Sequence, residues 1–402
     1  MANHGTEEKK IVFITAEDFF GLKSVSRFIE GFLKYAPEDF SIDIIGLTSD
    51  KIKRPVNKWI SFSLYNKQFR FLPVYYKANE EVDNAIELLI FSLKVYFHCR
   101  YNCRVILFFQ RLGPALLSCL QPGHKLIVIH SEMARVLSQI KNKVRFLGFF
   151  PLFYLMCERI TFRRMNCIYI VHNASVDYYK NRHPSQARKF LFLPTFYDKS
   201  IFYPFFEEKI AIRKRLPDIF HAVSPEKKWI LFVGQLIPQK DPFLLIETFQ
   251  KIIHRGVDAV MLIVGVGKLR MKTECYAKKL GVGNLTVFLG FFPHQMMPLV
   301  YNAADVLLLT SRIEGCPFVV LEALGCGIPV VATNVGEIKR FVHNGFSGEV
   351  VDSFDPSVIA DAVVAVLEKP ETYSRGNCTL SVIEYSPDKI FHPVYKICRE
   401  LT

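Results

Sequence analysis

The sequence predicts an α/β protein built from two doubly wound domains. Short runs rich in β-branched residues alternate with longer helical patterns, and this alternation starts twice along the chain. The short runs are apolar almost throughout, which is typical of parallel strands covered by helices on both faces. The length of 402 residues agrees with this organisation, because it exceeds one ordinary core and suits two domains of roughly 150–200 residues.

The first domain is expected to span residues 1–200. A linker then follows, because Pro194 and three further prolines interrupt the alternation between residues 194 and 228. The helical patterns of this domain lie at residues 23–35, 80–96 and 175–181. Its strand candidates are residues 11–15, 42–47, 105–109, 126–130 and 168–171.

The second domain is expected to span residues 201–385, and residues 386–402 are expected to pack back on the first domain. Ligands of doubly wound sheets bind at the carboxyl ends of strands, so the sequence predicts a site in the cleft between two domains. The strand candidates are residues 229–233, 260–264, 285–289, 306–310 and 329–333. The helical patterns lie at residues 242–254, 269–280, 317–324 and 356–367.

Charge is distributed unevenly between the two halves. Residues 1–200 hold 29 lysines and arginines against 17 acidic residues, a net charge of +12, whereas the rest of the chain has a net charge of +1. Such asymmetry suggests that the first half faces an anionic partner, such as nucleic acid, a phospholipid surface or an acidic substrate. The alternative that these residues only keep this half soluble stays open.

The ten cysteines form no C-x-x-C pair, and no histidine cluster completes a zinc site. With no signal-peptide pattern at the start of the chain, a reducing cytoplasmic compartment is expected. The apolar stretch 146–157 is shorter than the roughly 20 residues that cross a bilayer. Because basic residues flank it, it is read either as a surface-lying membrane segment or as a buried helix with a basic end.

The sharpest motif is a pair of glutamates, Glu314 and Glu322, separated by seven residues. Glu314 follows a predicted strand, and Glu322 falls in the first turns of a helix that Pro317 can start. The backbone N–H groups at such a helix start attract phosphate. The Glu322 carboxylate can accept both hydroxyls of a ribose, and Glu314 can accept hydroxyls of a sugar. In the competing interpretation, Glu322 is a solvent-facing helical residue and Glu314 only complements the helix dipole.

This motif lies within SRIEGCPFVVLEALGCGIPVVATNVGE, and further motifs surround it: FVGQLIPQKDPFLLIETF, VMLIVGVGKLR, NLTVFLGFF, YNAADVLLLTS and HNGFSGEVV. In their order and spacing they resemble the retaining GT-B glycosyltransferases of family 4, the glycosyl transferases group 1. The resemblance covers residues 230–370, and over residues 1–200 only the general pattern matches, together with NASVDYY and PTFYDKSIFYP. It implies the GT-B fold, in which two Rossmann-like domains face each other across a cleft.

The resemblance assigns a role to each matching residue. Glu322 would bind the donor ribose, Glu314 would bind the donor sugar, and Lys240 would neutralise the diphosphate leaving group. The family's second diphosphate cation, an arginine, is replaced by Gln235, which can donate a hydrogen bond but carries no charge. The backbone near the sugar and phosphates would come from Gly315, Cys316, Pro317, Phe318 and Val319.

The first domain matches the family less closely. Gly21 is the only glycine in the loop expected near the donor phosphates, and Glu17 and Asp18 beside it would repel a diphosphate. His130 occupies the place of a histidine that lies close to the donor sugar, which makes it the third catalytic candidate beside Glu314 and Lys240. In the alternative interpretation, His130 ends a strand and only forms hydrogen bonds with backbone groups.

We therefore expect a cytoplasmic retaining glycosyltransferase that needs no cofactor or metal and takes a nucleotide-sugar donor, with a UDP-sugar as first choice. Its acceptor would be a glycan or a lipid-linked molecule, and its basic first domain could meet an anionic membrane at the inner face of the cell membrane. A sugar-nucleotide epimerase, and a non-catalytic basic protein that binds membrane or nucleic acid, stay open as alternatives. Nucleic acid is not an expected partner, since neither an aromatic-basic alternation nor a DNA-reading motif is present.

Overall fold

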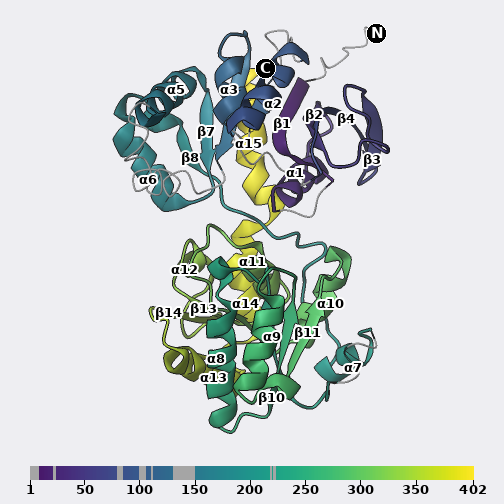
Figure 1. Ribbon diagram of the computed structural model, residues 1–402, viewed down its shortest axis with the longest axis vertical. Helices are drawn as coiled ribbons and strands as arrows, with labels where there is room; N and C mark the ends of the chain where they lie inside the picture. Colours follow the sequence, from purple (N-terminus) through teal and green to yellow (C-terminus); the bar gives the residue numbers. More distant parts are fainter. Residues whose placement is uncertain are drawn as a thin grey trace, which may run out of the picture. The chain divides into compact units, whose positions relative to one another are not determined.

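The computed structural model describes residues 9–20, 24–78, 85–98, 106–109, 112–129, 150–217, 220 and 223–402. It contains two compact units (Figure 1). Unit 1 comprises Met1–Pro194 together with Pro387–Thr402, and unit 2 comprises Thr195–Ser386. Both units are α/β with mainly parallel sheets, so the predicted class is confirmed.

Unit 1 contains, within its described residues, an eight-stranded sheet in the order β3-β4-β2-β1-β5-β6-β7-β8. All neighbouring strands are parallel except β3 and β4. The central strands are apolar because helices cover both faces of the sheet. The strands are β1 (Lys9–Asp18), β2 (Phe40–Thr48), β3 (Ile60–Leu64), β4 (Lys67–Tyr76), β5 (Ile106–Phe109), β6 (His124–Ile129), β7 (Cys167–Ile170) and β8 (Phe190–Phe192).

The antiparallel hairpin β3–β4 was not predicted from the sequence. Tyr65 and Asn66 connect its strands with φ values of 52° and 61°. Two positive φ values give the loop a twist that matches that of the flanking strands. Because a tyrosine holds the place where glycine or asparagine is usual, this turn is hard to recognise from residue types alone.

Helices cover the two faces of the unit 1 sheet. One face carries the core cluster formed by β1 residues such as Val12 and Ile14 with side chains of α2, α3, α5 and α6. Phe13 points to the opposite face, where its ring lies 5.9 Å from that of Phe32 on α1. The helical segments of unit 1 are α1 (Ser24–Lys34), α2 (Ala85–His98), α3 (Leu112–Ser118), α5 (Phe150–Arg164), α6 (Asn173–Arg182), η2 (Pro184–Lys189) and α15 (Pro387–Leu401).

The last helix, α15, belongs to unit 1 although it follows unit 2 in the chain (Figure 1). The Tyr395 hydroxyl donates a hydrogen bond of 2.5 Å to the carbonyl of Phe32 on α1. The Phe391 ring lies 5.4 Å from that of Phe28, edge to face. Aromatic side chains of α15 therefore complete the core on this face of the sheet.

Unit 2 contains a six-stranded parallel sheet in the order β11-β10-β9-β12-β13-β14 within its described residues. The chain passes from β9 outward through β10 to β11, and then returns to the other side of β9 to form β12, β13 and β14. The strand order therefore reverses between β9 and β12. The strands are β9 (Lys228–Val233), β10 (Ala259–Val264), β11 (Thr286–Gly290), β12 (Val306–Leu309), β13 (Val330–Thr333) and β14 (Gly348–Val351).

Helical segments connect and cover these strands. Their starts follow familiar capping rules: Asp355 caps the helix that begins at Pro356 by accepting from the Ser357 N–H at 2.7 Å. They are α7 (Lys209–Lys214), η4 (Pro238–Lys240), α8 (Pro242–His254), α9 (Arg270–Lys279), η5 (Gly283–Leu285), η6 (His294–Met296), α10 (Met297–Ala303), α11 (Phe318–Gly325), α12 (Ile338–Phe341), α13 (Pro356–Glu368), α14 (Arg375–Val382) and η7 (Ile383–Tyr385). Among the described residues, no helix is long and apolar enough to cross a membrane.

Candidate functional site

The strand order of unit 2 reverses between β9 and β12, and ligands of doubly wound sheets bind at the carboxyl ends of the strands beside such a reversal. The loops that follow these two strands are tied together there. The Arg312 N–H donates to the Gln239 carbonyl at 2.8 Å, and the Arg312 guanidinium donates to the Asp241 carboxylate at 2.6 Å. Residues 71 positions apart in the sequence therefore share one edge of the sheet.

Asp241 ends the loop after β9 and fixes the direction of Lys240 just before it. Its φ of 43° lies in the left-handed region. Its carboxylate accepts from the Leu244 N–H at 3.2 Å, which caps α8. The Thr310 hydroxyl donates to the Asp241 carbonyl at 3.1 Å from the neighbouring strand end. These contacts leave the residue before the cap little backbone freedom.

Lys240 and Glu314 meet at this edge from the two sides of the strand reversal. The Lys240 ammonium group contacts Oε1 of Glu314. The Ser311 hydroxyl donates to the same oxygen at 2.6 Å. The side chains of Lys240 and Glu314 are 19% and 9% exposed, so both are partly withdrawn from water while still open to it. A positive charge and a hydrogen-bond acceptor are thus held side by side.

Glu322 is buried on α11, with 2% of its surface exposed. The hydroxyl of Tyr301 donates to its Oε2 at 2.9 Å, and Nε2 of His294 lies 3.2 Å from its Oε1. Tyr301 is fully buried and comes from α10, so it holds the carboxylate in a fixed orientation. The interpretation of Glu322 as a solvent-facing helical residue is therefore wrong.

The backbone at the start of α11 lies between the two glutamates. Pro317 is the N-cap, and its φ of −75° and ψ of 119° are extended. The first amides of a helix, here those of Phe318 and Val319, have no acceptor inside the helix. Glu337 donates its N–H to the Gly315 carbonyl at 2.9 Å, which attaches the loop after β13 to this segment.

Cys316 is buried beside Thr195, whose N–H lies 3.3 Å and whose hydroxyl lies 2.9 Å from the sulfur. Burial raises the pKa of the Cys316 thiol to about 12. The thiol therefore stays protonated at neutral pH, and a thiolate nucleophile is not available here. Its part in the site is to shape the backbone before α11.

Two glycines allow loops to approach each other closely at this edge. Gly336 has a φ of 60°, and a Cβ there would lie 2.3 Å from the Gly315 carbonyl oxygen. Gly265 has a φ of 140°, and a Cβ there would lie 1.9 Å from the Gly234 carbonyl oxygen. Larger residues at these positions would push apart the loops at this edge.

The structure thus brings Lys240, Glu314 and Glu322 to one edge of the sheet, together with the backbone of residues 315–319. Gln235 lies in the loop after β9 with an exposed side chain. Its carbonyl accepts from the Ile237 N–H at 3.0 Å, so only the side chain faces outward. Gly21 and His130 lie outside the described residues.

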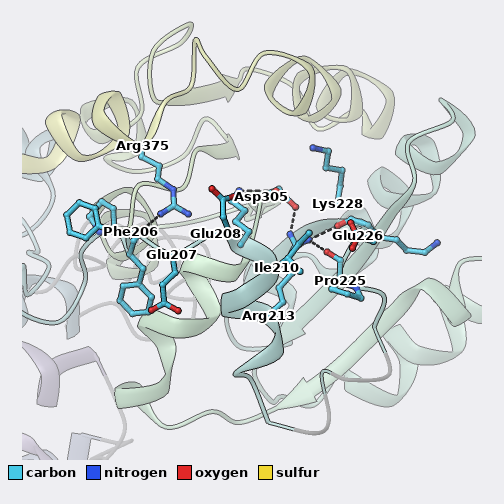
Figure 2. A pocket seen from close by; sticks show the side chains of 14 residues that line it. Phe206, Glu207, Glu208, Ile210, Arg213, Pro225, Glu226, Lys228, Asp305 and Arg375 are labelled. Carbon is cyan, nitrogen blue, oxygen red and sulfur yellow. Dashed lines mark hydrogen bonds and ion pairs between the residues drawn. The ribbon is translucent and has the colours of Figure 1, made fainter.

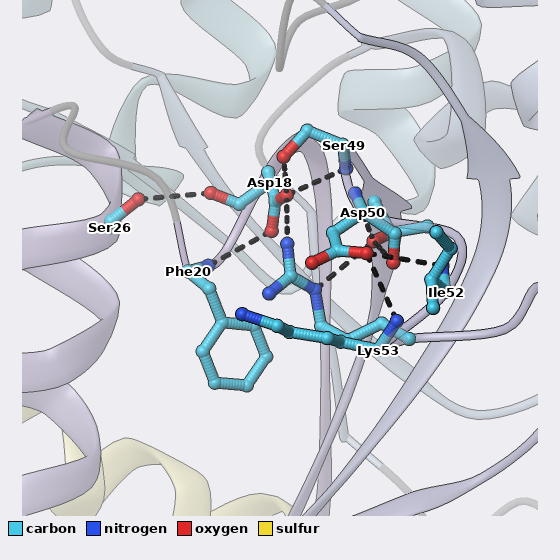
Figure 3. Close-up of polar contacts among 9 residues, drawn as sticks. Asp18, Phe20, Ser26, Ser49, Asp50, Ile52 and Lys53 are labelled. Carbon is cyan, nitrogen blue, oxygen red and sulfur yellow. Dashed lines mark hydrogen bonds and ion pairs between the residues drawn. The ribbon is translucent and has the colours of Figure 1, made fainter.

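Asp18, at the end of β1 in unit 1, differs from the expectation of a bare negative charge that would repel phosphate. Its buried carboxylate accepts from the Ser49 hydroxyl at 2.6 Å, the Ser49 N–H at 2.7 Å and the Arg54 guanidinium at 2.7 Å (Figure 3). The charge is therefore compensated, and that expectation is wrong. Asp18 instead joins the loops after β1 and β2.

Three contributors to the unit 2 site were not singled out from the sequence: Tyr301, His294 and Ser311. Tyr301 and Ser311 both lie in the motif YNAADVLLLTS. That motif covers the end of α10 and the strand after it, and nothing in it says which polar side chain points to a carboxylate on another helix. His294 precedes this motif in a short 3-10 turn.

A cavity of about 660 Å³ lies at the opposite edge of the same sheet, where Lys228 begins β9 (Figure 2). Asp305 there accepts from Lys209 at 2.9 Å, from Arg213 at 2.6 Å and from the Trp229 N–H at 2.7 Å. Arg213 also donates to the backbone carbonyls of Ala303 and Lys227. These partners give Lys209 and Arg213 a structural role. Within the described residues, no group of three His, Cys, Asp or Glu side chains could hold a metal ion.

Comparison with known proteins agrees with the geometry of unit 2. Residues 218–377 match the family described as glycosyl transferases group 1. The chain is 35% identical over 201 residues to an uncharacterized glycosyltransferase of Methanocaldococcus jannaschii, a match that covers 48% of this chain and 50% of the relative. It is 33% identical over 210 residues to a D-inositol 3-phosphate glycosyltransferase of Geodermatophilus obscurus, covering 50% and 44%. The chain thus spans about half the length of these curated relatives.

Solved structures extend the likeness to the whole chain. Sucrose-phosphate synthase of Thermosynechococcus elongatus matches with a TM-score of 0.74 and 19% identity, covering 98% of this chain and 99% of that one. HepE of Anabaena, in complex with UDP and glucose, matches with a TM-score of 0.72 and 15% identity, covering 98% and 100%. The chain therefore has the GT-B fold, as the resemblance implied. Its segment 218–377 is the part that matches the group 1 glycosyl transferases.

Proposed function

We propose that this protein is a retaining glycosyltransferase of family 4 that moves a sugar from a nucleotide-sugar donor to a glycan or lipid-linked acceptor. The observation that carries this proposal is the grouping of Lys240, Glu314 and buried Glu322 at the strand reversal of unit 2. A UDP-sugar is the first choice of donor, supported by the UDP and glucose present in the HepE complex.

The nucleoside would be held by Glu322. A carboxylate has about four acceptor positions, and two of those on Glu322 face Tyr301 and His294. The two hydroxyls of a ribose would replace present partners of this carboxylate, His294 among them. Tyr301 would keep the carboxylate oriented during this exchange, because its hydroxyl is buried.

The leaving diphosphate would be stabilised by Lys240 and by the free amides at the start of α11. Departure of a nucleoside diphosphate builds negative charge on its oxygens, and preorganised donors that face this charge lower the barrier. With these donors in place, we propose that the reaction needs no metal or other cofactor. Glu314 would accept hydroxyls of the sugar and hold Lys240 in position until the donor binds.

Gln235 is the departure from the family pattern that bears on rate. Its exposed amide can donate to a phosphate oxygen but brings no charge. A Gln235→Arg variant is expected to raise the turnover rate if the diphosphate approaches this loop. We propose that His130 lies close to the donor sugar and that Gly21 belongs to the loop near the donor phosphates, as the resemblance implies.

The acceptor side is assigned to the basic first half of the chain. Its net charge of +12 suits an acceptor that carries phosphate or lies in an anionic membrane. The name of one relative, D-inositol 3-phosphate glycosyltransferase, gives an example of a phosphate-bearing acceptor in a similar protein. We propose a cytoplasmic enzyme peripheral to the inner face of the membrane, with nucleic acid excluded from its partners.

The test is release of nucleoside diphosphate from UDP-, GDP- and ADP-sugars by the purified full-length chain, with water or an added membrane-lipid extract as the acceptor of the sugar. We expect release from one donor and at least about a hundredfold loss in Glu314→Gln. Lys279→Ala, at an exposed lysine in the last turn of α9, is the matched control and should keep the activity of the unchanged protein. An NMR spectrum of the transferred sugar would show the donor's anomeric configuration if the enzyme is retaining. Free epimerised sugar in place of a transferred one would favour the epimerase instead.

A further inference from the structure

Helix α2 of unit 1 is apolar on two opposite faces. Phe91 and Val95 point into the core cluster and are buried. On the far side, five large apolar side chains, here called the α2 stripe, are 39% to 72% exposed. The α2 stripe consists of Ile86, Leu89, Ile90, Leu93 and Phe97.

The α2 stripe is continuous because of its spacing. Residues at i, i+3, i+4, i+7 and i+11 fall within about 100° of one another around a helix. They extend over about 16 Å of the helix axis at about 1.5 Å per residue. A contiguous exposed apolar face of this kind marks an interaction surface, unlike scattered single residues.

A second helix on this face of the sheet, α5, supplies positive charge, and α3 lies between it and α2. Helices α2 and α5 pack on the same face of the sheet, since Phe91 of α2 and Phe162 of α5 belong to one core cluster. On α5, Met156 and Ile160 are 53% and 43% exposed. Its other exposed side chains, among those the structure describes, are three arginines: Arg159, Arg163 and Arg164.

Acidic groups on the described parts of these two helices are already engaged. Glu158 of α5 is buried and accepts from Arg182 at 3.2 Å and from His183 at 3.0 Å. Glu87 of α2 contacts Lys77 at 2.5 Å. The outward charge of the two helices is therefore positive, on the same face of unit 1 as the apolar stripe.

We propose that the α2 stripe and the arginines of α5 form a docking face for an anionic lipid bilayer. The apolar side chains would enter the acyl boundary, and the arginines would contact the headgroups. A second copy of the chain fits less well, because a two-fold contact through this face would bring the same arginines near each other. The inference rests on the proposed function for its membrane-bound acceptor, and its test does not depend on sugar transfer.

The experiment is sedimentation of the full-length chain with vesicles of phosphatidylcholine alone or mixed with phosphatidylglycerol. We expect binding to the anionic vesicles, and a loss of about tenfold or more in affinity in the double variant Leu89→Gln/Leu93→Gln. Arg159→Gln/Arg163→Gln should lower affinity for anionic vesicles by about fivefold per arginine. Leu380→Gln is the matched control, because Leu380 is 59% exposed on α14 of unit 2.

Absence of binding by the unchanged chain, or unaltered binding by the α2 variant, would overturn the proposal. So would a dimer in sedimentation equilibrium that the α2 variant dissolves, since the stripe would then be an interface between copies. The thermal shift produced by UDP, measured on the same variants, should stay unchanged and shows that they are folded. If UDP shifts the melting temperature of none of these proteins while they still bind the vesicles, the result counts against the proposed function and supports the docking face.

Discussion

Tyr301 shows how one residue can serve a site without meeting the substrate. Its hydroxyl is buried and donates to Oε2 of Glu322 at 2.9 Å. In Tyr301→Phe the carboxylate loses this partner while the ring packing remains. Since one such hydrogen bond to a charged group contributes roughly 1.5–3 kcal/mol, we expect donor affinity to fall about tenfold or more, with little change in maximal rate. Calorimetric titration with the donor measures it, and equal affinities would contradict the positioning role.

Lys240 is expected to act mainly on the leaving group. Lys240→Ala removes the charge that faces a departing diphosphate, so the maximal rate should fall about a hundredfold or more. Fold and nucleoside binding should change little, because the lysine side chain is partly exposed. Rates measured at saturating donor test this, with Lys279→Ala as the control. An unchanged rate would remove Lys240 from the chemistry.

Single residues also show the limits of sequence reasoning. Glu314 and Glu322 could be singled out from their places after a strand and at a helix start, where ligands of such sheets bind. Lys240 was assigned only through the resemblance. Tyr301 and His294 could not be found, because their contacts with Glu322 depend on how α10 and the turn before it lie against α11. The charge of Asp18 was misjudged for the same reason, since its partner Arg54 comes from the next loop.

At the scale of elements, α15 contributes to the stability of unit 1. Tyr395 is buried, stacks on Phe32 with a centroid distance of 4.7 Å, and donates to the Phe32 carbonyl. Tyr395→Ala should lower the free energy of unfolding of unit 1 by about 3–5 kcal/mol. Tyr395→Phe should lower it by only about 1–2 kcal/mol, through one lost hydrogen bond. Urea unfolding measures both, and a similar loss in the two variants would contradict the importance of the ring.

Most strands and helices could be predicted because apolar periodicity is local. The central strand candidates 42–47 and 260–264, for example, lie inside β2 and β10. The hairpin β3–β4 was missed because β3 alternates polar and apolar residues at the sheet edge and its turn lacks the usual glycine. The predicted ends of elements differ from the observed ends by a few residues, because capping contacts rather than the apolar pattern decide where an element ends.

At the scale of the whole molecule, buried ion pairs make stability depend on pH. Although burial alone would raise the pKa of Asp305, Lys209 and Arg213 hold it below its ordinary value of 3.8. A carboxylate with a lowered pKa in the folded state stabilises the fold above about pH 4, and this contribution is lost as pH falls through the folded pKa.

Unit 2 should therefore lose stability progressively below about pH 4, and Asp305→Asn should weaken this dependence. At neutral pH the same variant should be destabilised by about 3–5 kcal/mol, because buried Arg213 and half-buried Lys209 lose their partner. Asp361→Asn, at a carboxylate whose side chain is 67% exposed, is the control. Thermal unfolding across the pH range tests this. If Asp305→Asn loses stability at low pH as the unchanged protein does, other carboxylates cause that loss.

The most direct test of the central claim, a nucleotide-sugar site in unit 2, is a thermal-shift screen of the whole chain against UDP-, GDP- and ADP-sugars, with Glu322→Ala beside it. A ligand at 100 times its dissociation constant stabilises a fold by about 2.7 kcal/mol, which corresponds to about 5–10 °C for a unit of this size. We predict such a shift with one nucleotide and its loss in Glu322→Ala. No shift with any of them, or an equal shift in the variant, would contradict the site described here.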